Sequence, residues 1–373
     1  MSSSLFLTNW LFCTGAALIL IYLLRFPHAL TNKNKGILFL LLGGIVLKLF
    51  IPFEFSFTVT IPVSVILTYT REKEQSLLFG TLSIKSFLIF IWLSVAFLIL
   101  IYTLYKRHRL KRLLTHIPET SDAFILHLTR SLCEEENIRQ VPAILQIDTL
   151  ASPFVFGLRK PVIVLPKGMQ KEHLKMVLLH ELQHIKLGHL YIKFLANFVT
   201  IVHWWLPVVW FLNAKLSQAL EHQVDYFVTK KISKEESVGY MSALIDFAKL
   251  GYTHTNILAP LSFADNQRIL KHRIAAITDS IKKQSKTALT ALQKVAILVA
   301  FLLLMFPLFY TFEASYNPSP EELDGAVSIT PENSYFMTDK DGTYHLYVDD
   351  QFFASFEKRP NSFQDIEVKS LSK

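Results

Sequence analysis

The stretch most able to do chemistry is the pentapeptide "HELQH" at residues 180–184. His180 and His184 are four residues apart, so a helix places both imidazoles on one face, with Glu181 directly beside them. In the H-E-x-x-H pattern, the two imidazoles bind zinc and the glutamate acts as the catalytic base that activates a water. The alternative is a surface helix whose histidines merely meet solvent. A further ligand downstream would favour zinc.

Such a ligand occurs in "ALEHQVDYFV" at residues 219–228. Glu221 and Asp225 are one helical turn apart, in the E-x-x-x-D pattern of zincins whose third ligand is a glutamate. We expect Glu221 to bind zinc. Asp225 is expected to accept the second ring N–H of a ligand histidine, most simply His180, and so to fix its tautomer. An amphipathic helix with two acids on one side is the less favoured interpretation at this spacing.

Other zinc-peptidase classes fit the sequence less well. The metzincin pattern needs Gly seven and His ten positions after the first His, where this chain has Leu187 and Leu190. Intramembrane site-2 proteases use an L-D-G aspartate, and "NPSPEELDG" at residues 317–325 contains one. Asp324 is predicted to lie across the membrane from His180, so we treat that match as coincidence. His189 is expected to be a polar residue at a helix end.

A strand that binds substrate is expected upstream, in "ASPFVFGLRKPVIVLP" at residues 151–166. Apolar residues alternate there between Pro and Gly, which predicts two short strands. In zincins an edge strand beside the active-site helix pairs with the substrate backbone. Ser152, Phe154 and Phe156 mark the candidate strand. A hairpin that only packs into the core is the equal alternative.

Long apolar segments surround these residues. Of the 373 residues, 51% are hydrophobic and 18% charged, which indicates several membrane spans and a modest domain outside them. Four segments are long enough to cross a bilayer, and the first reads as a permanent span, not as a signal peptide. They cover residues 5–24, 36–53, 82–105 and 288–312. The two cysteines are too few for a disulfide framework or a thiolate metal site.

The basic residues predict the orientation of these spans, because Lys and Arg concentrate on the cytoplasmic side. Residues 106–289 hold 25 Lys and Arg against 15 Asp and Glu, a surplus of 10. Residues 313–373 hold 5 Lys and Arg against 12 Asp and Glu, a deficit of 7 basic residues. We expect the first of these regions to be cytoplasmic, facing anionic lipid, and the second to be extracytoplasmic. The chain has no nucleic-acid-binding motif, and its net charge of +8 follows from this topology.

The expected domains follow from these spans. Residues 1–105 form an N-terminal membrane region with an extracytoplasmic loop at 54–81. Residues 106–287 form the cytoplasmic metallopeptidase domain. Residues 288–312 are the last span, and 313–373 a short extracytoplasmic tail. Basic flanks at both ends of the cytoplasmic region exclude a single crossing by the apolar segment 190–212, which is therefore expected to be re-entrant, interfacial or packed within the domain. A homodimer contact is another possible role for it.

Together these residues resemble the membrane-embedded zinc metallopeptidases of the BlaR/MecR antirepressor type. The resemblance rests on the strand pair, the "LLHELQHIKLGH" helix, "EHQVD", and "RILKHRIAAI" at 268–277, and it covers about residues 1–312. It implies a gluzincin-like fold, one zinc per chain and a protease of the bacterial-type cell membrane. It also implies signal transduction in which the peptidase cuts a cytoplasmic repressor, its own chain, or both.

One departure from that family concerns the C-terminal side. The β-lactam sensors carry a penicillin-binding domain after the last span, whereas 61 residues follow residue 312 here. We therefore expect the sensor domain to be lacking. "SYFMTDKDGTYHLYVDDQFFASF" at 334–356 predicts a small three-stranded β-meander.

The complete prediction is an α-helical multi-pass membrane protein with a cytoplasmic α+β metallopeptidase domain and a β-rich tail. Two other functions share the same ligands: a quality-control membrane protease, and a non-catalytic sensor with a structural zinc site. The presence of Glu181 disfavours the sensor, because a structural site needs no base.

Overall fold

The computed structural model describes most of the chain, in two compact units, Met1–Ala314 and Ser315–Lys373, and each is considered by itself. The described residues are 3–26, 29–30, 35–51, 55, 57–63, 77–78, 82–148, 150, 152–253, 263–281, 289–314, 329–338, 343–356, 363 and 366–370. The loop predicted at 54–81 and the "NPSPEELDG" stretch with Asp324 fall largely or wholly outside them.

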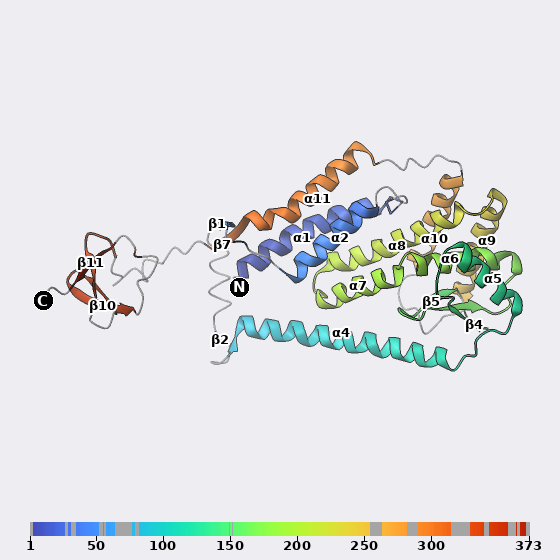
Figure 1. Cartoon of the computed structure of the whole chain (residues 1–373), viewed down its shortest axis with the longest axis horizontal. Coiled ribbons are helices and arrows are strands. Elements are labelled where there is room, and N and C mark those ends of the chain that lie inside the picture. Colours follow the sequence, from blue (N-terminus) through green and yellow to red (C-terminus); the bar gives the residue numbers. More distant parts are fainter. Residues whose placement is uncertain are drawn as a thin grey trace. The chain divides into compact units, whose positions relative to one another are not determined.

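Long apolar helices dominate the first unit (Figure 1). They are α1 (Ser3–Leu24), α2 (Lys35–Phe50), α4 (Ile84–Thr115) and α11 (Ala291–Phe309). Among the described helices, α1, α4 and α11 are long and apolar enough to cross a membrane, and a fourth span results if a bent helix pair described below counts as one. The predicted span 36–53 is shorter than expected. It ends at Phe50 and has 16 residues, because Pro52 disfavours helical geometry in the residue before it.

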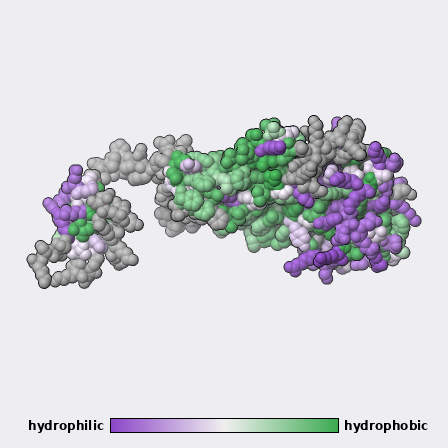
Figure 2. All heavy atoms as spheres, turned by 45° about the horizontal axis from the view of Figure 1, so that its top comes forward, coloured by the Kyte–Doolittle hydropathy of each residue, from purple (hydrophilic) through white to green (hydrophobic). Residues whose placement is uncertain are grey.

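The α1, α2 and α11 helices pack together and against the first half of α8 (Pro207–Thr229). Buried Ala16, Leu20 and Ile45 lie at the centre of this apolar core. In the space-filling view hydrophobic residues cover this part of the molecule, and hydrophilic residues gather at the opposite end of the unit (Figure 2). The first unit is thus divided between an apolar helical layer and a polar domain.

The polar domain combines a small sheet with helices. The sheet has the order β4 (Ala143–Ile147), β6 (Val162–Pro166), β5 (Phe154–Phe156), with β6 parallel to β4 and antiparallel to β5. Sequence reasoning predicted β5 and β6 but missed β4. The turn between β5 and β6 needs Gly157, since its φ is +98° and an added Cβ would lie 2.4 Å from the Lys160 carbonyl oxygen. β5 is left at one edge of the sheet.

Helices pack over this sheet around a second apolar core. They are α5 (Ala123–Glu135), α6 (Lys171–Lys186), the second half of α8, α9 (Lys234–Thr253) and α10 (Phe263–Ile281). Asp122 begins α5 by accepting hydrogen bonds from the N–H groups of Phe124 and Ile125. Leu178, Leu182 and Val224 are fully buried in this core. Residues on α6 and α8 therefore have fixed positions relative to each other.

The apolar segment 190–212 falls within two helices. α7 (His189–Val202) follows α6 at an angle of 59°, and α8 starts at Pro207. Gly188 lies between α6 and α7 with φ +69°. Pro207 starts α8, because a proline at the first helical position needs no N–H partner. The two helices pack against each other, and α6 with α7 form the bent pair that could together make one broken span.

The α4 helix contacts this segment where α7 ends and the chain continues toward α8. The Trp92 indole donates a hydrogen bond to the Val202 carbonyl at 2.6 Å, and the Trp204 indole donates to the Trp92 carbonyl at 3.3 Å. Two short strand pairs complete the unit: β1 (Val59–Val63) parallel to β7 (Tyr310–Ala314), and β2 (Leu77–Leu78) antiparallel to β3 (Leu82–Ser83).

The second unit contains a four-stranded sheet. β8 (Ser334–Thr338), β9 (Tyr344–Val348) and β10 (Gln351–Phe356) form an antiparallel meander, and β11 (Glu367–Ser370) adds parallel to β8. The meander has the three strands that the sequence predicted, and β11 was missed. Phe336 and Leu346 are fully buried in its core.

Candidate active site

His180, Glu181 and His184 lie on the buried face of α6. Each is only 7% exposed, although all three are polar. Leu178, Leu179 and Leu182 anchor the helix in the domain core. The apolar residues thus fix the helix, and the spacing of four turns both imidazoles in the same direction.

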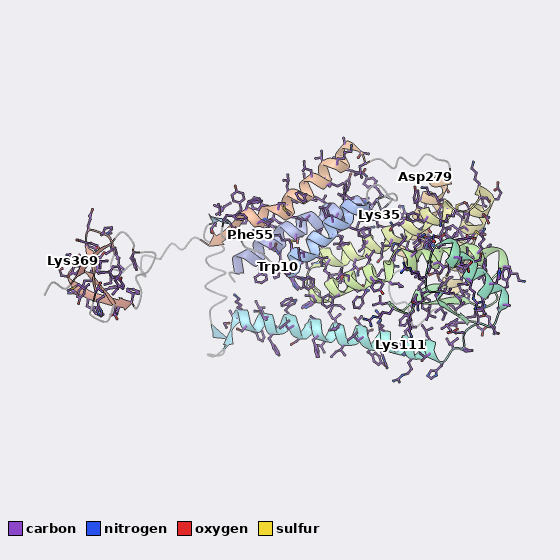
Figure 3. All side chains as sticks on the ribbon, in the orientation of Figure 1. Trp10, Lys35, Phe55, Lys111, Asp279 and Lys369 are labelled. Atoms are coloured by element: carbon purple, nitrogen blue, oxygen red, sulfur yellow. The ribbon has the colours of Figure 1, made fainter. Side chains whose placement is uncertain are left out.

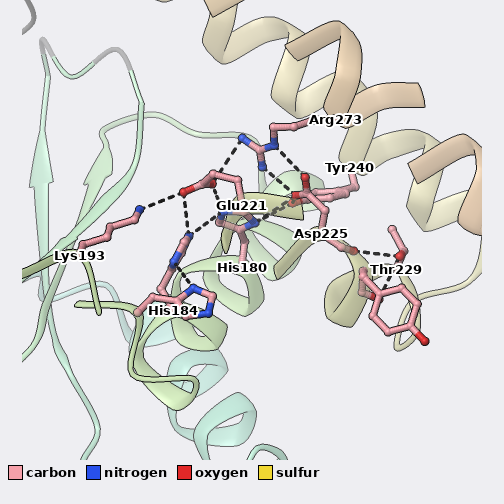
Figure 4. Close-up of polar contacts among 10 residues, drawn as sticks. His180, His184, Lys193, Glu221, Asp225, Thr229, Tyr240 and Arg273 are labelled. Carbon is pink, nitrogen blue, oxygen red and sulfur yellow. Dashed lines mark hydrogen bonds and ion pairs between the residues drawn. The ribbon is translucent and has the colours of Figure 1, made fainter. Parts of the chain in front are cut away.

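Glu221 reaches these imidazoles from α8 (Figure 4). The two Nε2 atoms of His180 and His184 are 3.3 Å apart. The Glu221 carboxylate oxygens are 3.4 Å from Nε2 of His180 and 3.5 Å from Nε2 of His184. These three side chains form the one group of potential metal ligands among the described residues, with all ligand atoms within 4.8 Å of one another.

The distances fit a tetrahedral zinc site. Zinc lies about 2.0–2.1 Å from imidazole nitrogens and carboxylate oxygens, so tetrahedral ligand atoms lie roughly 3.3–3.4 Å apart. The two imidazole nitrogens are 3.3 Å apart, and each has a Glu221 oxygen at a similar distance, Oε2 at 3.4 Å from His180 and Oε1 at 3.5 Å from His184. Two nitrogen ligands and one oxygen leave a fourth position open, as in catalytic zinc sites.

Behind His180, a charged network fixes the ring. Nδ1 of His180 lies 2.7 Å from the Tyr240 hydroxyl, which donates a hydrogen bond of 2.5 Å to Asp225. Arg273 donates two hydrogen bonds to the same carboxylate, at 2.7 and 2.8 Å. Because the Tyr240 proton points to Asp225, the hydroxyl accepts from Nδ1–H, which leaves the lone pair of Nε2 free for a metal.

In this arrangement Asp225 lies beside His180, and a second group adds to the predicted contact. Its oxygen lies 3.5 Å from Nδ1 of His180, and Tyr240 is inserted between the two as the closer partner. Burial favours a neutral carboxyl, but the neighbouring Arg273 outweighs it and lowers the pKa of Asp225. Arg273 also lies 3.7 Å from the Glu221 carboxylate, so its guanidinium is shared between the two acids of α8.

Behind His184, the network carries no formal charge. Nδ1 of His184 lies 3.0 Å from Nδ1 of His189, and Nε2 of His189 lies 3.1 Å from the Gln223 side-chain oxygen. If that oxygen accepts from Nε2–H of His189, then Nδ1 of His189 accepts from His184, and Nε2 of His184 is again free. Burial lowers the pKa of His189 to about 3, which keeps the ring neutral.

Glu221 and Glu181 differ in their electrostatics. Burial acts to raise the pKa of Glu221, but His184, His180 and the Lys193 ammonium, 3.1 Å from Oε1, lower it well below the usual value. Burial raises the pKa of Glu181 to about 7. The first carboxylate is therefore poised as an anion, and the second as a group that accepts and releases a proton near neutral pH.

A cavity of about 290 Å³ opens beside these groups. Its lining includes Glu181, the three ligand candidates, and the segment Ser152, Pro153, Phe154 and Val155. The edge strand β5 thus faces the site, as the sequence predicted for Ser152 and Phe154. Phe156 differs: its ring contacts the Arg107 guanidinium and lines another cavity. Phe154 and Phe156 are two residues apart, so they share one face of β5, and both pack against Leu145 and Val164.

Comparison with known proteins identifies the family. Residues 53–277 match the family described as BlaR1 peptidase M56. The chain belongs to this family. Regulatory protein BlaR1 of Bacillus licheniformis is 26% identical over 192 residues, 51% of this chain and 32% of that protein. BlaR1 of Staphylococcus aureus is 30% identical over 148 residues, 38% and 25% of the two chains.

A third relative of this M56 member is the methicillin resistance mecR1 protein of Staphylococcus aureus, 25% identical over 232 residues, 60% of this chain and 38% of that protein. The matches span between a quarter and two fifths of the length of these relatives. The match to the M56 family includes α4, the three-stranded sheet and α6 to α8, so it contains every residue of the site.

Sequence reasoning missed several members of this M56 site. Tyr240 lies on α9 and Lys193 on α7, outside any recognisable motif, and Gln223 lies at a variable position of the E-x-x-x-D pattern on α8. His189 was expected at a helix end, and it does begin α7, but its contact with His184 was not foreseen. The signal that was available for Gln223 is its position between Glu221 and Asp225.

Proposed function

We propose that the protein is a membrane-embedded zinc metalloendopeptidase with a gluzincin-like site. His180, His184 and Glu221 are the proposed ligands and Glu181 the proposed catalytic base. The observation that carries the proposal is the convergence of two imidazole nitrogens and the Glu221 carboxylate, with one ligand atom of each within 4.8 Å of the others, beside a buried glutamate. Membership of the M56 family supports it.

A zinc ion bound there would supply Lewis acidity and make a neighbouring water more acidic. The chain's own groups do the rest. Glu181 accepts a proton from the attacking water and returns it to the leaving amine, and a pKa near 7 suits both transfers. Tyr240 and His189 hold the two imidazoles in the tautomer that presents Nε2.

The substrate is proposed to bind as an extended strand along β5. This strand lies at the edge of its sheet and pairs with β6 alone among the described strands, so its other side offers free backbone groups. The segment 152–155 lines the cavity. Backbone pairing of this kind selects an extended peptide and leaves sequence specificity to the pockets on either side.

The catalytic domain is proposed to face the cytoplasm, with the 313–373 tail outside. Lys35 and Lys111 lie at the ends of α2 and α4 that point toward the peptidase domain, and Trp10 and Phe55 lie toward the opposite ends (Figure 3). This distribution agrees with the concentration of basic residues on the cytoplasmic side. A cytoplasmic transcriptional repressor, or the chain itself, is then the proposed substrate, in keeping with relatives named as regulatory proteins.

The test compares wild type with Glu181→Ala in membranes. We measure zinc content, and cleavage of the chain itself and of any repressor encoded beside its gene. We expect about one zinc in both proteins and cleavage by wild type alone. Zinc without cleavage in either protein would instead support a structural zinc sensor, and cleavage of misfolded membrane proteins but no repressor would support a quality-control protease. Absence of zinc from wild type would refute the proposal.

A further inference from the structure

A second cavity, of about 890 Å³, lies between the end of α4 and the β5–β6 hairpin. It shares no lining residue with the catalytic cavity. Its lining combines apolar residues, among them Leu104, Leu114 and Val162, with basic ones. The basic lining residues are Arg107, His108, Lys111, Arg159 and Lys160, and Glu119 is the one acidic residue among the lining.

The basic side chains of this cavity have no acidic partners in the described part of the chain. Lys111, Arg159 and Lys160 are exposed and belong to none of its ion pairs. The Arg107 guanidinium lies 5.7 Å from the ring centre of Phe156 and 5.5 Å from that of Phe194. These aromatic contacts hold Arg107 at the cavity and leave its charge uncompensated. The cavity therefore concentrates positive charge, with Arg107, Lys111, Arg159 and Lys160 against the single carboxylate of Glu119.

The position along α4 indicates where an anionic ligand comes from. A helix rises about 1.5 Å per residue, so about 20 residues cross the roughly 30 Å hydrocarbon core. Counted from Ile84, the crossing ends near Leu104, where the cavity begins. Tyr102 and Tyr105 are exposed at this level, as expected for residues at a membrane interface. The basic residues that follow then lie at the depth of the lipid headgroups.

We propose that this cavity binds an anionic phospholipid. Its phosphate would lie among Lys111, Arg159 and Lys160, and an acyl chain would extend from Leu104 along the apolar part of α4 into the membrane. The same hairpin that contributes Arg159 and Lys160 begins with the residues that line the catalytic cavity. A bound lipid would therefore also fasten the domain's substrate strand to the membrane surface. The proposal goes beyond peptide hydrolysis and does not depend on it.

The test uses the full chain in nanodiscs that contain equal amounts of phosphatidylglycerol and phosphatidylcholine. Native mass spectrometry after release counts the lipids that remain bound to the protein. The variant Arg159→Gln/Lys160→Gln is compared with Arg130→Gln/Arg139→Gln, which removes the same charge from exposed positions outside the cavity. Near a membrane each basic residue contributes about 1 kcal/mol, so the loss of two weakens retention of phosphatidylglycerol roughly 30-fold. The control double variant and wild type should retain it equally.

Three results would overturn the proposal. The first is equal retention of phosphatidylglycerol by the cavity variant and wild type. The second is equal retention of the two lipids by wild type. The third is displacement of phosphatidylglycerol by millimolar inorganic phosphate, which would identify a soluble anion as the ligand. Photo-crosslinking of wild type with a headgroup-labelled lipid gives an independent answer, because the label must map to residues 104–119 or 156–162.

Discussion

The two sides of the candidate zinc site hold their histidines with different chemistry. Behind His180, residues of α8, α9 and α10 form a charged network in which Tyr240 joins the ring to Asp225 and Arg273. Behind His184, His189 and Gln223 form a chain without formal charge. Both networks present the same Nε2 atom to the metal position. The tautomer of each imidazole is therefore set by an acceptor directed at Nδ1–H, and either a charged or a neutral network can supply that acceptor.

The largest effect should come from the charged side. Asp225→Asn removes the carboxylate that Tyr240 and the Nε and Nη2 atoms of Arg273 contact, and leaves the mostly buried guanidinium only the more distant Glu221, at 3.7 Å. Breaking a buried pair in this way costs about 3–5 kcal/mol, and we expect zinc affinity to fall up to about 100-fold. Thermal unfolding and zinc titration of the purified chain measure the two losses. Unchanged values for both would refute the charged network.

A smaller loss, confined to the metal, is expected for Tyr240→Phe. The substitution keeps the buried ring but removes the hydroxyl between His180 and Asp225, whose pairing with Arg273 persists. Zinc affinity should fall about 10-fold or more, with a much smaller loss of stability than for Asp225→Asn. Equal losses of stability in Tyr240→Phe and Asp225→Asn would contradict the claim that the Asp225–Arg273 ion pair, and not the Tyr240 hydroxyl, stabilises the fold.

On the neutral side, His189→Leu should weaken zinc binding by about 10-fold. The leucine cannot accept the proton on Nδ1 of His184, so that ring is no longer held in one tautomer. The matched variant Gln223→Leu removes a side chain that contacts His189 and not His184, so it should weaken zinc binding less. Zinc competition assays rank the two. A larger loss of zinc affinity for Gln223→Leu than for His189→Leu would contradict the order His184–His189–Gln223 in this hydrogen-bond chain.

The smallest effect on zinc is expected at a buried carboxylate outside both networks. Glu136 is 1% exposed and pairs with Lys186 and Lys231, which lower its pKa below 4.5 against the effect of burial. A depressed folded-state pKa stabilises the fold above the unfolded-state value, and this contribution is lost as the pH falls through the folded-state value. Glu136→Gln should therefore cost about 1–3 kcal/mol at pH 7 and less at pH 4, with zinc affinity unchanged. Thermal unfolding at both pH values checks the sign.

The ligand side of the site was predictable because it follows from local spacing. His180, Glu181 and His184 occupy one helix, and Glu221 with Asp225 another, so short patterns contain them. Tyr240 was not predictable, since it is 60 residues from His180 in sequence and reaches the ring only through the packing of α9 against α6. The same holds for His189, where the turn at Gly188 returns the chain toward His184.

The fold shows a similar division. Apolar length predicted the long helices, but the end of α2 before Pro52 and the break before Pro207 were set by proline. Alternating residues predicted β5 and β6, whereas β4 and β11 pair in parallel with strands far from them in sequence. Parallel pairing leaves no hairpin signal in the sequence, which is why both strands were missed.

Zinc K-edge X-ray absorption on the full chain, loaded with one equivalent of zinc, directly tests whether His180, His184 and Glu221 bind the metal. Two histidine nitrogens, one glutamate oxygen and a fourth light ligand predict a first shell of about four N and O atoms near 2.0–2.1 Å, with imidazole scattering from two rings. In Glu221→Ala one oxygen should be lost or replaced by water, while both imidazoles remain. A sulfur shell near 2.3 Å, or a shell without imidazole, would contradict the account.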